Sequence, residues 1–119
     1  MRLVLEGLVF NTSLITDELV QERYQASIDP EIVELFKKPA AEAEDLSFEL
    51  GRVRAKTMLA WGQDDRAGAF DVALLMLRLL RDGRLYVFPR CGHWAHVEHR
   101  GEFNRVVLQF FHDSQTDEN

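Results

Sequence analysis

With 119 residues the chain is long enough for one ordinary domain, and its 46% content of hydrophobic residues is typical of a globular protein with a buried core. A formal net charge of −6 argues against a surface that binds the phosphates of nucleic acid. No apolar run approaches the ~20 residues of a membrane span, and a single cysteine cannot form an internal disulfide. We therefore expect no membrane partner and a cytoplasmic location.

The N-terminal residues carry helical signals. Apolar residues recur at near-helical spacing from Leu3 to Val9, although a strand is also possible in so short a run. Thr16 stands where an N-cap is expected and an acidic first turn follows it. These signals predict a helix over Leu19–Ala26.

A second helix start follows directly. Asp29-Pro30-Glu31 combines a cap, a proline at the first helical position and an acidic side chain, which predicts a helix through Phe36 that stops before Pro39. The stretch Ala40–Asp45 is rich in alanine and glutamate. It is either a helix or a solvated connector.

After Gly51 the pattern alternates between short and long apolar runs. Thr57–Trp61 and Leu85–Phe88 are short apolar runs and predict buried strands. Phe70–Leu80 is apolar at nearly every position and predicts a well-buried helix. Glu102–Phe111 predicts an amphipathic helix. The apolar face of this last helix consists of Phe103, Val106, Val107, Phe110 and Phe111.

The order strand, helix, strand, helix predicts an α/β fold with two neighbouring parallel strands. Parallel strands need partners on both sides and helices over both faces, and two strands alone do not provide these. The sequence therefore indicates a parallel β-α-β-α unit that forms part of a larger domain.

Polar loops follow both predicted strands. The loop after the first strand contains Asp64 and Asp65, and the loop after the second contains Cys91 and His93. Since ligands in open α/β sheets bind beyond the carboxyl ends of the strands, we expect an acid and a histidine to meet there. An acid that orients a histidine is the arrangement of a serine-hydrolase triad, and the order of acid before histidine is that of the α/β-hydrolases.

Several motifs follow one another in a fixed order: Trp61-Gly62-Gln63-Asp64-Asp65-Arg66, Arg84–Phe88, Arg90-Cys91-Gly92-His93-Trp94-Ala95, Glu98-His99 and Glu102-Phe103-Asn104-Arg105. This ordered set resembles one family in particular, the meta-cleavage-product hydrolases. These α/β-hydrolases cleave a carbon–carbon bond in ring-fission products of aromatic degradation. The resemblance continues upstream through Ser13-Leu14-Ile15-Thr16 and covers nearly the whole chain.

The resemblance implies roles for four residues. Asp65, the second acid of its pair, matches the catalytic acid, and His93 matches the general base. Arg23 matches the arginine that binds the substrate carboxylate, which suits a planar guanidinium. Trp94 matches the aromatic neighbour of the histidine that lines the acyl pocket.

The resemblance also implies a domain organisation and a substrate. Residues 1–50 correspond to the end of a helical cap and residues 51–119 to the C-terminal part of the hydrolase core. The implied substrate is a small molecule of the 2-hydroxy-6-oxo-hexa-2,4-dienoate type. No metal or organic cofactor is needed, and assembly into a homo-oligomer is left open.

Other interpretations of these residues compete with catalysis. Asp65 would be part of a surface turn and His93 a hydrogen-bonded loop histidine. Arg23 would be a solvated helix arginine, and Trp94 a tryptophan that packs in the core. His93, His96 and His99 with Glu98 suggest a metal site, but a spacing of three fits no common zinc pattern. Cys91 is expected to be a small buried residue rather than a nucleophile.

Two features depart from a complete hydrolase. A nucleophile elbow has the pattern Gly-x-Ser-x-Gly, and none of the four serines, Ser13, Ser27, Ser47 and Ser114, has flanking glycines. We therefore expect the isolated chain to be inactive. The alternatives to a fragment of a carbon–carbon bond hydrolase are a fragment of another α/β-hydrolase, such as an esterase, and a non-catalytic remnant that binds a partner. Relatives also commonly place a proline shortly after the acid, whereas Gly68 here predicts a looser Asp65 loop.

Overall fold

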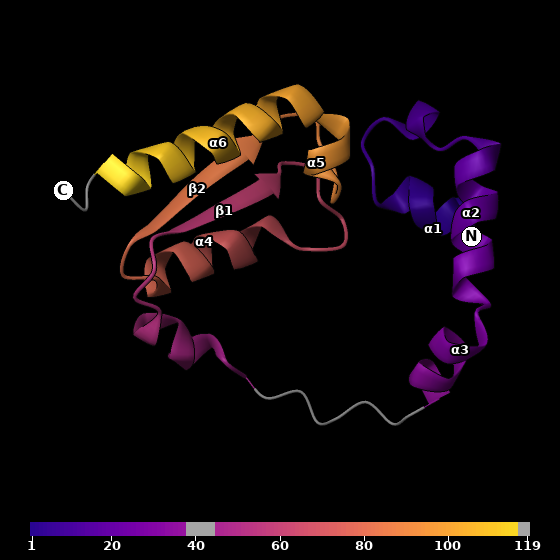
Figure 1. Ribbon diagram of the computed structural model, residues 1–119, viewed down its shortest axis with the longest axis horizontal. Helices are drawn as coiled ribbons and strands as arrows, with labels where there is room; N and C mark the ends of the chain where they lie inside the picture. The colour runs from indigo at the N-terminus through magenta and orange to yellow at the C-terminus, as the bar shows by residue number, and fades with distance from the viewer. Residues whose placement is uncertain (38–44, 117–119) are drawn as a thin grey trace.

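The computed structural model describes residues 1–37 and 45–116, so the expected helix or connector over Ala40–Asp45 lies outside the described residues except for its last position. The elements before residue 53 are helical, and a strand–helix–strand–helix unit follows (Figure 1). The helical elements are α1 (Arg2–Gly7), the 3-10 turn η1 (Thr12–Leu14), α2 (Asp17–Ser27), α3 (Pro30–Lys37) and the 3-10 turn η2 (Ser47–Arg52). The remaining elements are β1 (Thr57–Gly62), α4 (Phe70–Leu79), β2 (Gly83–Phe88), α5 (Ala95–Glu98) and α6 (Arg100–Thr116).

The predicted helix starts are confirmed by their caps. The Thr16 Oγ1 accepts a hydrogen bond from the Leu19 N–H at 3.2 Å, so this side chain satisfies a donor of the first turn of α2. The Asp29 carboxylate accepts the Glu31 N–H at 2.9 Å before α3. The first apolar run forms the helix α1 rather than a strand.

The two strands pair in parallel, as expected. Thr57 lies opposite Gly83 at one end of the ladder and Gly62 lies opposite Phe88 at the other. The helix α4 connects the strands, and α4 and α6 lie on opposite faces of the sheet (Figure 1). This arrangement is the β-α-β-α unit of an α/β fold, and both strands end on the side of the sheet where the polar loops begin.

The prediction that α4 is well buried was wrong. Only Ala73 of this helix is fully buried, whereas Val72, Leu74 and Leu75 are 46%, 43% and 53% exposed. The helix packs against β1, β2 and η2 with one face, and two strands offer too little sheet to cover the rest. The apolar composition of α4 therefore exceeds what this chain alone can bury.

The apolar face of α6 is narrower than predicted. Val106 is buried, but Phe111 is 60% exposed. Phe111 follows Phe110 by one residue, a rotation of about 100° around the helix axis, which turns its ring away from the sheet.

Among the described residues, no helix is both long and apolar enough to cross a membrane.

Two small cores meet at the loop of residues 90–94, which follows β2 and is called the histidine loop below. The first consists of Leu5, Val9 and Ile15, with Trp94 packed against it. The second is built on Phe88, Cys91 and Ala95, and the exposure of Phe88 and Cys91 is 0%. Because residues 91–95 contribute to both cores, the loop that carries His93 is packed from two sides.

Candidate active site

The loops that follow β1 and β2 are joined by their backbones. The Gln63 N–H donates to the Phe88 carbonyl at 2.9 Å, and the Asp64 N–H donates to the Cys91 carbonyl at 2.8 Å. These two bonds continue the pairing of the strands into the loops. Backbone contacts alone therefore hold the histidine loop beside the acid loop, which consists of residues 63–69 after β1.

Asp65 and His93 meet across this pair of loops. The His93 Nδ1 lies 2.8 Å from the Asp65 Oδ2, as expected for polar residues at the ends of adjacent parallel strands. The other carboxylate oxygen, Oδ1, accepts the N–H groups of Ala67 and Gly68, each at 2.8 Å. The Asp65 side chain is only 5% exposed and the His93 side chain 48% exposed. The acid is thus enclosed, and the imidazole faces solvent.

The surroundings of Asp65 keep it ionised. Burial by itself raises the pKa of this carboxyl, but hydrogen bonds from Gly68, His93 and Ala67 outweigh it and place the pKa below its ordinary value. A carboxylate can only accept hydrogen bonds, so the Nδ1 of His93 carries the proton in this pair. The lone pair of the neutral imidazole is then on Nε2, the nitrogen that acts as the base in a hydrolase triad.

The expectation that Gly68 loosens the acid loop was wrong. Its N–H donates to Asp65, and its carbonyl accepts the Trp61 indole N–H at 3.1 Å. A Cβ at this position would lie 3.1 Å from the Trp61 ring and 3.2 Å from the Asp65 Oδ2. Glycine here allows a close approach that fixes the carboxylate, and its conformational freedom is removed by two hydrogen bonds.

The structure describes no hydrogen bond or ion pair between Asp65 or His93 and the other two predicted site residues, Arg23 and Trp94. Arg23 lies on α2 with a half-exposed side chain, and the Glu22 carboxylate is 4.0 Å from its guanidinium. Trp94 follows His93 directly, is partly buried and packs against the cluster of Leu5, Val9 and Ile15. The contacts described for Trp94 are packing contacts, and its role in lining the acyl pocket stays a prediction.

Cys91 is buried, as expected, and is poorly suited to act as a nucleophile. Burial in apolar surroundings, reinforced by the charge of Glu98, raises the pKa of its thiol to about 12. Its Sγ lies 3.5 Å from the Gly92 carbonyl. The thiolate, which is the reactive form, is therefore scarce at neutral pH.

Cys91 should consequently resist alkylation while the chain is folded. We expect iodoacetamide at pH 8 to leave the folded chain unmodified and to label Cys91 rapidly in concentrated urea. Mass spectrometry of samples quenched over time measures both rates. Equal rates with and without urea would contradict the burial of this thiol.

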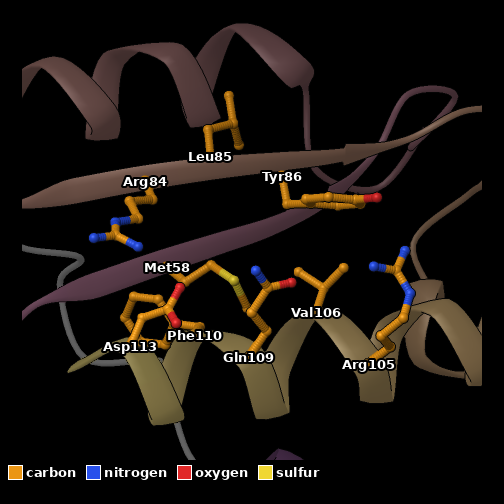
Figure 2. Close-up of a pocket in the computed structure, with 9 residues that line it drawn as sticks. All are labelled: Met58, Arg84, Leu85, Tyr86, Arg105, Val106, Gln109, Phe110 and Asp113. Atoms are coloured by element: carbon orange, nitrogen blue, oxygen red, sulfur yellow. The ribbon is translucent and has the colours of Figure 1, made fainter. Parts of the chain in front are cut away.

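The described residues offer no metal centre, since no three His, Cys, Asp or Glu side chains among them come together in a way that could hold an ion. A groove of about 310 Å³ lies between α6 and the strands and is lined by residues such as Arg84, Tyr86 and Gln109 (Figure 2). It includes neither Asp65 nor His93.

Sequence reasoning missed two residues that shape the site. Gly62 ends β1 where the backbone of the histidine loop approaches most closely: a Cβ there would lie 1.9 Å from the Gly92 carbonyl oxygen. Glu98 accepts hydrogen bonds from the histidine loop and from residues near the N-terminus. A glycine at the end of a buried strand is a weak signal for the close backbone approach at Gly62. Nothing in the local sequence indicates which backbone groups donate to Glu98.

The chain is similar to known hydrolases in sequence and in fold. No family profile matches the chain. The chain is 44% identical over 113 residues to a 2-hydroxy-6-oxo-6-phenylhexa-2,4-dienoate hydrolase of Burkholderia cepacia. It is 42% identical to a 2-hydroxy-6-oxononadienedioate/2-hydroxy-6-oxononatrienedioate hydrolase of Comamonas testosteroni. Each match covers 90% of this chain but 39% of the relative, so the chain spans about two fifths of the length of these relatives.

Solved structures give the same result. A meta-cleavage product hydrolase of Pseudomonas fluorescens superposes with a TM-score of 0.85 at 32% identity, over 96% of this chain and 45% of that one. A 2-hydroxy-6-oxo-6-phenylhexa-2,4-dienoate hydrolase of Rhodococcus superposes with a TM-score of 0.80 at 26% identity, over 93% and 43%. The chain therefore has the fold of the C-terminal part of an α/β-hydrolase and resembles, along nearly all of its length, the matching part of the meta-cleavage-product hydrolases.

Proposed function

We propose that this chain supplies the acid and the base of a serine-type hydrolase that cleaves a carbon–carbon bond in a 2-hydroxy-6-oxo-dienoate. The observation that carries the proposal is the 2.8 Å hydrogen bond between Asp65 and the Nδ1 of His93 at the carboxyl ends of two parallel strands. The substrate class comes from the names of the relatives, which are hydrolases of such dienoates.

In the proposed reaction, His93 moves protons and Asp65 holds it in place. A serine from the remainder of the fold attacks the substrate ketone, or helps water to attack it, and the Nε2 of His93 takes the proton released in that step. Asp65 keeps the imidazole in the required tautomer and stabilises the imidazolium that forms. The carbon–carbon bond beside the attacked carbonyl then breaks, and His93 gives its proton to the carbon leaving group. Where the serine has been acylated, a water that His93 deprotonates releases the acyl group as a carboxylic acid and restores the serine.

The proposed substrate contacts are Arg23 and Trp94. Arg23 presents a half-exposed guanidinium that forms a long ion pair of 4.0 Å with its sequence neighbour Glu22, and a planar fork of this kind suits the substrate carboxylate. Trp94 packs against the cluster of Leu5, Val9 and Ile15 and remains partly exposed. We propose that the exposed part of its indole lines the acyl pocket beside His93.

We further propose that residues 1–50 form the end of a cap and residues 51–119 the last part of the core. The 3-10 turn η2 spans this boundary and packs against α4. The exposed apolar side chains of Val72, Leu74 and Leu75 on α4 support a larger domain, because such residues are usually covered. The chain by itself contains no nucleophile elbow, so we expect no turnover from it alone.

A chimeric enzyme tests this proposal. The N-terminal part of the Burkholderia cepacia relative, up to the start of the match, is joined to this chain and assayed with 2-hydroxy-6-oxo-6-phenylhexa-2,4-dienoate. We expect hydrolysis by the chimera and a loss of several orders of magnitude on His93→Ala, since removal of a triad member leaves only residual catalysis. Each half alone serves as a control and should be inactive.

The same chimera separates the alternatives. A folded chimera that hydrolyses simple esters but not the dienoate would favour an esterase. A folded chimera that is inactive on both, and unchanged by His93→Ala, would favour a non-catalytic remnant and overturn the proposal. Circular dichroism and gel filtration establish folding before either conclusion is drawn.

A further inference from the structure

Glu98, the last residue of α5, connects two distant parts of the chain through one carboxylate. Its Oε2 accepts the backbone N–H groups of Phe10 and Asn11, each at 2.9 Å. Its Oε1 accepts the backbone N–H of Gly92 at 2.6 Å. Three backbone donors, two of them almost ninety positions away in sequence, therefore converge on a single side chain.

The backbone of residues 8–11 is in direct contact with the backbone of the histidine loop. The His93 N–H donates to the Leu8 carbonyl at 2.7 Å. A Cβ on Gly92 would lie 2.6 Å from the Leu8 carbonyl oxygen and 2.8 Å from the Val9 Cα, so the two backbones are in close contact. The position of His93 thus depends on where residues 8–11 are held.

We propose that Glu98 is a positioning residue for His93, an inference that rests on the proposed role of the Asp65–His93 pair. Glu98 binds residues 10 and 11 with one oxygen and Gly92 with the other, and so clamps the 8–11 segment against the histidine loop. Hydrogen bonds to a carboxylate are stronger than those between neutral groups, which suits a clamp made of three exposed or partly buried contacts. The clamp keeps the imidazole directed at Asp65.

The geometry makes glutamine an informative replacement. A carboxamide accepts through its one oxygen, and its NH₂ group faces an N–H donor on the other side. Glu98→Gln therefore has to release either Gly92 or the pair Phe10 and Asn11. Glu98→Asp retains the charge but is one methylene shorter, so it reaches one side of the clamp only.

The test uses the full 119-residue chain labelled with ¹⁵N. Imidazole ¹⁵N chemical shifts report whether the His93 proton is on Nδ1 or Nε2, and amide hydrogen exchange reports the three donors. For Glu98→Gln we expect a shift of His93 toward the Nε2–H tautomer, as its hydrogen bond to Asp65 weakens. Exchange should become faster by about 10-fold to 100-fold on the side that glutamine releases, either at Gly92 or at Phe10 and Asn11, which is the range for a lost hydrogen bond to a charged group.

Glu102→Gln is the matched control. Glu102 on α6 accepts the Tyr86 hydroxyl at 2.7 Å and lies 3.5 Å from the Nδ1 of His99. Its variant loses the same charge, the glutamine oxygen can still accept the Tyr86 hydroxyl, and none of the hydrogen bonds described for Glu102 reaches the 8–11 segment. We expect the His93 tautomer to stay as in the unmodified chain. Glu98→Asp should give an intermediate population of the Nδ1–H form.

The outcomes separate positioning from mere stabilisation. Faster amide exchange in Glu98→Gln with an unchanged His93 tautomer would overturn the proposal, because Glu98 would then support the backbone only. Global unfolding of both Glu98 variants would also overturn it, since a clamp predicts a local effect. If instead the proposed catalytic function is wrong, the chimera will be inactive while Glu98→Gln still changes the His93 tautomer in the 119-residue chain.

Discussion

Replacing Gly62 with alanine is expected to be the most damaging of the glycine-to-alanine substitutions in this chain. The added Cβ would lie 1.9 Å from the Gly92 carbonyl oxygen and 2.5 Å from that of Cys91. Both are backbone atoms of the packed histidine loop, so they cannot move aside as the end of a flexible side chain would. Overpacking of this kind costs about 1–3 kcal/mol and occasionally more. Urea unfolding followed by circular dichroism measures the loss of stability.

The variant should also separate the two loops of the site. In its NMR spectrum we expect the His93 signals to approach those of a histidine without a carboxylate partner. Gly101→Ala is the matched control, since a Cβ at Gly101 on α6 meets nothing within 4 Å and alanine favours a helix over glycine by up to about 1 kcal/mol. Equal stability of the Gly62 and Gly101 variants would show that the close approach at Gly62 is not required.

Replacing Asp65 with asparagine in the active chimera should lower kcat on the order of 10⁴-fold, the scale known for the acid of a serine-protease triad. The physical reason is the tautomer. The amide NH₂ of asparagine donates to Nδ1 of His93, which moves the imidazole proton to Nε2 and removes the base. Asp64→Asn is the matched control, because Asp64 is exposed and its neighbour alone bonds to His93. A loss of similar size in both variants would contradict the assignment of the acid.

The same substitution has a consequence for stability that depends on pH. The pKa of Asp65 is lowered in the folded chain, so its contribution is complete well above the unfolded pKa of about 3.9 and is lost as the pH falls through the folded pKa. We therefore expect the unmodified chain to be more stable than Asp65→Asn at neutral pH, with the difference shrinking on acidification. Urea titrations from pH 7 to pH 3 measure this difference. A gap that stays constant over this range would exclude a lowered pKa for Asp65.

Much of the fold could be predicted because its signals are local. The caps at Thr16 and Asp29 mark the starts of α2 and α3 through contacts with residues two or three positions away. The two short apolar runs became β1 and β2, and their order with α4 implied parallel pairing. Parallel pairing places the ends of both strands on the same side, which is why Asp65 and His93 could be expected to meet.

The amino-acid sequence by itself thus determined the helix starts, the two strands and the acid–histidine pair, because each depends on neighbours in the chain or on the period of the apolar pattern. Only the tertiary structure decided which residues hold that pair in place. The contact of Gly62 with Gly92, the bonds of Glu98 to Phe10 and Asn11, and the exposure of α4 depend on how segments distant in sequence approach one another. Such contacts arise from the packing of distant segments in space, so local patterns of residues indicate them weakly, as at Gly62, or not at all, as at Glu98.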